Sequence, residues 1–204
     1  KKPQFTISKY ISSLPLLTLS GISLGLHFAF WVWSIEHTSL AHSLLWVSMH
    51  PIILNVYAWV LWFLKFQDAK KPTLLETVGT IIGLVGGSVM LLDVILSPVT
   101  DEDPEGNVKP GLAGDFVAFL GAVAMAVYLT IGRNVRSWCP IWLYVFPVVG
   151  TSVLTCISMS FVFESSVTFV GLTSSSVFGW MNPKYLGYSV YLGGGAGVGG
   201  HTLI

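Results

Sequence analysis

Serine, histidine and tryptophan recur at helical spacing near the start of the apolar run 40–64. At about 100° of rotation per residue, these side chains fall within about 100° of one another on a helix. The stripe consists of Ser39, His42, Ser43, Trp46 and His50. Polar groups inside a bilayer are costly and mark functional sites, so the stripe predicts the wall of a solute-binding cavity. The alternative is that these groups hydrogen-bond neighbouring helices.

Pro51 directly follows this stripe. A proline inside a helix removes a backbone hydrogen bond and frees a carbonyl group, so we expect a kink here. His27, Trp31 and Tyr128 are further candidates for a cavity lining, and the alternative for each is a packing or interfacial role. Aromatic and imidazole groups bind cationic or aromatic solutes by stacking and cation–π contact, at about 0.5 to 2 kcal/mol each.

Asp93 is a carboxylate well inside an apolar run. Its helical angle places it near Gly79, Gly83 and Gly86, which predicts that it faces protein rather than lipid. We therefore consider Asp93 a candidate for coupling transport to a proton. The alternative is that it reaches the outer interface, because Pro98 follows closely.

Other kinds of chemistry lack the residue patterns they need. The sequence holds no nucleophile elbow, phosphate loop or Walker motif, and the spacing of its histidines matches no metal-binding motif. Cys139 and Cys156 fall in a predicted loop and an apolar run, so we expect no disulfide between them. We expect neither an enzyme nor a cofactor.

The candidate residues lie in long apolar segments of a chain that is 53% hydrophobic and 10% charged, against roughly 25% charged in an average soluble domain. A hydrocarbon core about 30 Å thick needs about 20 apolar residues of helix. Runs of that length occur at 12–34, 40–64, 73–96, 112–132, 140–162 and 185–204. In lipid such segments form helices, because the backbone must satisfy its own hydrogen bonds. The sequence predicts an all-α, polytopic transmembrane helix bundle with about six spans.

Cationic residues are concentrated in alternate gaps between the runs. These residues are Lys1, Lys2, Lys9, Lys65, Lys70, Lys71, Arg133 and Arg136. Cationic loops are retained in the cytoplasm, so we expect the amino end of this segment to be cytoplasmic and the acidic stretch 101–105 to lie outside. The formal net charge is zero, so a nucleic-acid partner is not expected.

Small residues recur every four positions in three of the runs: Gly21 with Gly25, Gly79 with Gly83 and Gly87, and Gly114 with Ala118 and Ala122. This spacing predicts close packing of helices in lipid. The chain begins at Lys1 and stops at Ile204 inside an apolar run, which indicates an internal fragment of a longer protein.

Short motifs, taken in order along the chain, resemble the third to sixth and the eighth spans of EamA-like carriers of the drug/metabolite transporter superfamily. They are HFAFW at 27–31, EHTSLAHSLL at 36–45, LLETVG at 74–79, GDF at 114–116 and YLG at 191–193. One departure is the gap 67–71, where family members commonly carry a Glu and Asp68 is the possible substitute.

The resemblance implies a ten-span carrier that is built from two inverted five-helix repeats and moves small organic solutes or metabolites by alternating access. Residues 1–100 would hold the last three helices of the first repeat. Residues 101–111 would form the acidic outer loop, and residues 112–204 the first three helices of the second repeat. The alternative is a multi-span membrane protein that does not transport, such as a scaffold or receptor.

Overall fold

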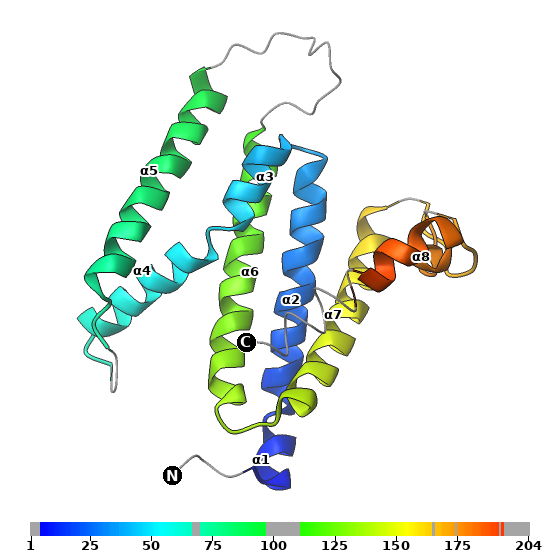
Figure 1. The fold of residues 1–204 in the computed structure, drawn as a ribbon, viewed down its shortest axis with the longest axis horizontal. Helices are drawn as coiled ribbons and strands as arrows, with labels where there is room; N and C mark the ends of the chain where they lie inside the picture. Colours follow the sequence, from blue (N-terminus) through cyan, green and yellow to red (C-terminus); the bar gives the residue numbers. More distant parts are fainter. Residues whose placement is uncertain are drawn as a thin grey trace.

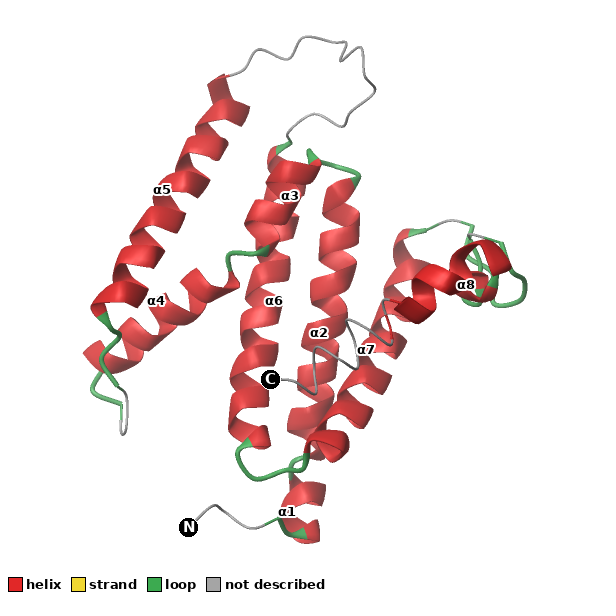
Figure 2. Cartoon of the chain, viewed as in Figure 1, coloured by secondary structure: helices red, strands yellow, loops and turns green. Residues whose placement is uncertain are grey.

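The protein is all-α, as predicted. The computed structural model describes residues 5–66, 70–96, 111–164, 166–173, 175–191 and 193. The helices are α1 (Ile7–Ser12), α2 (Leu14–Ile35), α3 (Leu40–Val47), α4 (His50–Phe63), α5 (Leu74–Leu96), α6 (Leu112–Arg136), α7 (Ile141–Phe163) and α8 (Pro183–Val190), with a 3-10 turn at Gly179–Met181. Extended structure in these residues amounts to an isolated bridge between Thr168 and Ser176 (Figures 1 and 2).

Five segments of the described chain are long and apolar enough to cross a bilayer, which supports an integral membrane protein. They are α2, the α3–α4 pair, α5, α6 and α7, and they correspond to the first five predicted runs. Of the sixth predicted run, α8 covers the beginning, whereas residues 194–204 lie outside the described residues. A sixth span therefore stays a prediction.

The second predicted run is broken into two helices at Ser48 and Met49. Pro51 has no backbone N–H to donate to the carbonyl of Val47, so the α-helical ladder cannot continue through this point. The predicted kink is confirmed. Beyond it, α4 turns away from α6 and meets the lower part of α5 (Figure 1).

The tightest packing joins α2 to α6 on one side and to α7 on the other. A Cβ atom added at Gly21 would lie 2.6 Å from the carbonyl oxygen of Val148, and one added at Gly25 would lie 2.8 Å from that of Ser152. The absence of side chains at these two glycines therefore lets α2 approach α7 closely. The close packing predicted from Gly21 and Gly25 is confirmed.

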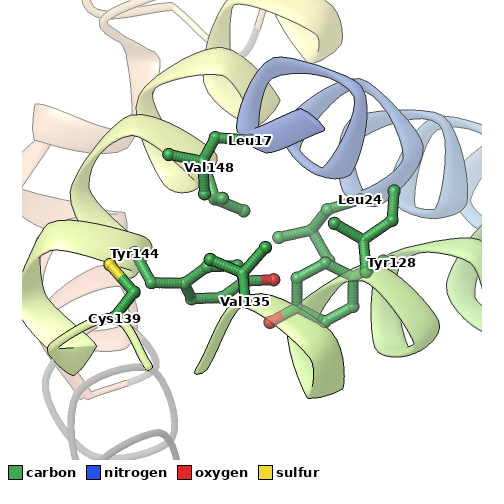
Figure 3. Packing of buried hydrophobic residues seen from close by; sticks show 8 residues of the cluster. Leu17, Leu24, Tyr128, Val135, Cys139, Tyr144 and Val148 are labelled. Carbon is green, nitrogen blue, oxygen red and sulfur yellow. The ribbon is translucent and has the colours of Figure 1, made fainter. Parts of the chain in front are cut away.

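Buried side chains fill the lower half of this three-helix core. Figure 3 shows Leu17 of α2, Val135 of α6 and Val148 of α7 gathered around the ring of Tyr144. The Tyr144 hydroxyl lies 2.9 Å from Ser20 Oγ, so the buried phenol is hydrogen-bonded. The residues in this cluster come from all three helices and hold them as one unit.

The α5 helix attaches to α4 through polar side chains. Asn55 Nδ2 donates to Thr80 Oγ1 at 2.6 Å, and Trp59 Nε1 donates to Thr77 Oγ1 at 3.2 Å. Of the predicted packing glycines, Gly83 lies against Ile52 and Gly87 against Met49, whereas a Cβ at Gly79 would meet no atom of the described residues within 4 Å. The packing prediction for this span therefore holds for two of its three glycines.

Candidate functional site

A line of polar and aromatic side chains runs along the contact between α2 and α3. Ser34 Oγ and Ser43 Oγ are hydrogen-bonded at 2.6 Å, which fixes the register of these two antiparallel helices. From each of these serines, a step of three residues and then one of four, away from the α2–α3 turn, stays on the same helix face. Each step covers the same distance along both helix axes. The first step places Trp31 level with Trp46. The second step leads to His27 on α2, whereas after Trp46 it crosses the break at Ser48 and Met49 and reaches His50 at the start of α4. We call this line the α2–α3 seam: Ser34, Ser43, Trp31, Trp46, His27 and His50.

The lower part of the seam holds polar atoms without partners. Trp31 Nε1, Trp46 Nε1 and His50 Nδ1 are buried and have no hydrogen-bond partner among the described residues. His27, in contrast, donates from Nδ1 to the carbonyl oxygen of Gly121 at 2.9 Å. Burying a polar group without a hydrogen bond is costly, so a solute with hydrogen-bonding groups would be stabilised beside these atoms.

Above the seam, a buried carboxylate joins the α2–α3 turn to α6. Thr38 Oγ1 donates to Asp115 Oδ1 at 2.6 Å, and His42 Nδ1 lies 3.0 Å from Asp115 Oδ2. The backbone N–H of Gly111 donates to Thr38 Oγ1 at 3.0 Å. His42 and Asp115 are each 3% exposed and Thr38 is fully buried. We call Thr38, His42 and Asp115 the Asp115 cluster.

Close backbone approach brings the members of this cluster together. A Cβ at Gly114 would lie 2.6 Å from the carbonyl carbon and oxygen of His37, so glycine allows the α2–α3 turn to rest on the first turn of α6. Ser39 caps α3, with its hydroxyl oxygen accepting from the N–H of His42. Both features hold the Thr38 hydroxyl and the His42 ring above Asp115.

Sequence reasoning did not select Asp115 as a functional residue. A carboxylate in the first turn of a helix is explained by the helix dipole alone, so its position gave no further signal. Its partner His42 lies 73 residues away in the sequence. A usable signal was a glycine directly before a carboxylate at a predicted helix start, Gly114 and Asp115. It could have been combined with the predicted polar stripe and with Thr38.

A groove separates α4 from α6 on the other side of the helix break. It consists of two adjoining cavities of about 260 and 570 Å³, both lined by Leu54, Tyr57 and Thr130. The larger cavity also meets Lys70 and Arg133. The groove follows from the break at Ser48 and Met49, because the break lets α4 diverge from α6 while α3 remains packed on it (Figure 1).

A third cavity of about 340 Å³ lies among α3, α4, α5 and α6 and is almost wholly apolar. Trp46 and Phe119 line it and meet edge to face, with ring centroids 6.2 Å apart. Trp46 thus belongs to the seam and also borders this cavity.

The structure brings most of the predicted site residues together and places two of them elsewhere. His27, Trp31, His42, Trp46 and His50 are brought to the seam or the Asp115 cluster. Tyr128 is not, because it faces the buried core, where its ring lies 6.5 Å from that of Tyr144. Asp93 lies in α5, but its side chain is outside the described residues, and its coupling role stays a prediction.

Comparison with known proteins gives no match to a family model, to a curated protein or to a solved structure.

Proposed function

We propose that this chain belongs to a membrane carrier that moves small organic solutes by alternating access. The observation that carries the proposal is the asymmetry of one interface. At one end, α3 is held to α6 by the buried Asp115 cluster, whereas at the other end α4 leaves α6 and a groove of about 570 Å³ remains. A pathway that is closed on one side and open on the other is what alternating access requires.

In this proposal the carried solute binds at the seam. Going down the broken span, His42 belongs to the closed end, Trp46 and His50 carry unpaired polar atoms, and Tyr57 lines the groove. Along the chain, the buried indole and imidazole nitrogens therefore lie between the groove and the closed end. The break at Ser48 and Met49 supplies a hinge between the two halves.

The charges at the groove favour one orientation in the membrane. Lys70 and Arg133 line the wide end, and cationic side chains are retained on the cytoplasmic side. We therefore assign the open groove to the cytoplasmic side and the Asp115 cluster to the outer side. The resemblance to EamA-like carriers gives further support, since it would place α3–α4 and α6 in different repeats, so that the interface between them is the one that rocks.

Solute flux through the full-length protein in liposomes tests this proposal. The panel comprises labelled amino acids, aromatic metabolites and organic cations. We expect saturable flux of at least one class, and a several-fold loss in Trp46→Leu. The matched control is Trp142→Leu, because Trp142 lies on α7 with 61% of its surface exposed and away from the seam.

Two outcomes would contradict the carrier. Absence of flux across the whole panel, with protein that remains folded in the bilayer, would favour a scaffold or receptor instead. Equal losses of flux in Trp46→Leu and Trp142→Leu would show that the seam has no special part in solute binding.

A further inference from the structure

We infer that the Asp115 cluster is a proton-binding site, and that its proton is transported together with, or in exchange for, the solute. This inference rests on the proposed carrier function. It names a site of coupling other than Asp93, the candidate from the sequence. The reasons lie in the burial of the cluster, its hydrogen-bond pattern and its place between parts that are expected to move.

The hydrogen bonds leave one titratable position in the cluster. The Thr38 hydroxyl accepts from the Gly111 N–H and donates its own proton to Asp115 Oδ1. The other carboxylate oxygen, Oδ2, shares a single proton with His42 Nδ1 across 3.0 Å. An ionised Asp115 with neutral His42 carries one negative charge. Adding one proton yields either a carboxylate with an imidazolium or a carboxylic acid with a neutral imidazole, and both have no net charge.

The two charge states favour different conformations. A net negative charge that is almost fully buried is costly in a bilayer, although the dipole at the start of α6 offsets part of that cost. Separating α3 from α6 would expose Asp115 to water and remove the cost of burying its charge. Proton binding removes the net charge and stabilises the closed arrangement. The proton-bound carrier would therefore be closed outside and open inside, as in this structure, and proton loss would favour outward opening.

Other titratable groups near the cluster are few in the described part of the chain. On α2 and its end they are His27, Glu36 and His37, and on α4 the group is His50. Glu36 and His37 are exposed, and the His37 ring stacks on Trp33 with centroids 3.6 Å apart. His27 bonds to Gly121 lower in the seam. None of these side chains hydrogen-bonds to Asp115 or to His42 in the described part of the chain.

The Asp115→Asn variant separates proton binding from structure. An Asn at this position can accept from Thr38 through its carbonyl and donate to His42 through its amide, so both links between α3 and α6 remain. It cannot take up the proton. Glu36→Gln is the matched control, because it also removes one carboxylate near the outer ends of the helices but from an exposed position.

The measurement uses the full-length protein in liposomes with an internal pH-sensitive dye and a solute from the panel that is transported. In wild type and Glu36→Gln, we expect solute addition to move protons and an imposed pH gradient to stimulate uptake. In Asp115→Asn, we expect both effects to be lost while solute exchange at equal pH continues. A merely structural pair would lower exchange and gradient-driven uptake together.

The other possible results would each overturn the site, the coupling or the carrier. Proton movement that persists in Asp115→Asn, or that is lost equally in Glu36→Gln, would overturn the site. If Asp115→Asn does not fold, His42→Gln replaces it, and unchanged proton coupling in that variant would equally overturn the site. Solute flux in wild type that is indifferent to pH gradients would overturn coupling but leave the carrier standing. Absence of any flux would overturn the carrier itself, and coupling with it.

Discussion

The α2–α6–α7 core and the α4–α5 arm are both apolar enough to cross a bilayer, but they are packed very differently. In the core, Leu17, Tyr144 and Val148 are at most 1% exposed, whereas α4 has no buried residue. Apolarity therefore explains why both regions enter the membrane and does not explain which helices pack. In lipid, close packing depends on where small residues lie, and Gly21 and Gly25 meet backbone of α7, whereas Gly79 and Gly86 of α5 meet no atom of the described residues within 4 Å.

The Asp115 cluster is the strongest polar link between the core and the broken span that leads to the arm. Replacing Asp115 by Ala would leave the buried His42 ring without a partner and the buried Thr38 hydroxyl without an acceptor for its proton. Removing one member of a buried pair typically costs roughly 3 to 5 kcal/mol, and we expect a loss of that size in the free energy of unfolding. Unfolding by denaturing detergent measures it. A loss as small as that of an exposed substitution such as Glu36→Gln would contradict the cluster's structural part.

The glycines offer a matched pair across the two regions. A side chain at Gly25 would lie 2.6 Å from Thr155 Cβ, whereas one at Gly86 of α5 would meet no atom within 4 Å in the described chain. We expect Gly25→Val to destabilise by about 1 to 3 kcal/mol through overpacking, with a much smaller effect for Gly86→Val. Thermal unfolding in detergent compares them. Equal losses would show that α5 is packed in the membrane as tightly as the core.

Thiol labelling is the test of this comparison with the smallest expected effect. Burial raises the pKa of the Cys139 thiol, which lies between α6 and α7 at the end of the core. The thiolate is the reactive form, and the raised pKa leaves a smaller fraction of Cys139 as thiolate at neutral pH. The labelling rate should therefore increase with pH, and the midpoint of that increase should lie at a higher pH than for an exposed cysteine. A cysteine introduced at exposed Lys70, with Cys139 and Cys156 replaced by Ala, should label faster. Equal rates at neutral pH would contradict the burial of Cys139.

Local signals in the sequence were enough to predict the helices. Apolar runs marked the first five spans and Pro51 marked the break, because each of these features acts on its own stretch of backbone. The glycine spacing predicted close packing, but the helix that packs against these glycines could not be predicted from the sequence. Gly21 and Gly25 meet α7, which is more than a hundred residues away in the sequence.

The candidate site could be predicted in part. The stripe containing His42, Trp46 and His50 is a local helical pattern, and it does lie along a buried contact. Asp115 has an adequate local explanation as a helix-start anion, so nothing in the sequence required a partner for it. Tyr128 shows the reverse case, because the face of α6 that carries it meets the core with α7, and the choice of face depends on tertiary packing.

The register between α2 and α3 makes the length of their connection more important than its composition. The turn from Glu36 to Ser39 sets how far α3 is rotated and raised relative to α2. One residue deleted there would turn α3 by about 100° and shift it by about 1.5 Å. His42 would leave Asp115 and Ser43 would leave Ser34 at once, although no side chain had been altered. Homologous proteins should therefore keep the number of residues in this turn, together with Thr38 and Ser39.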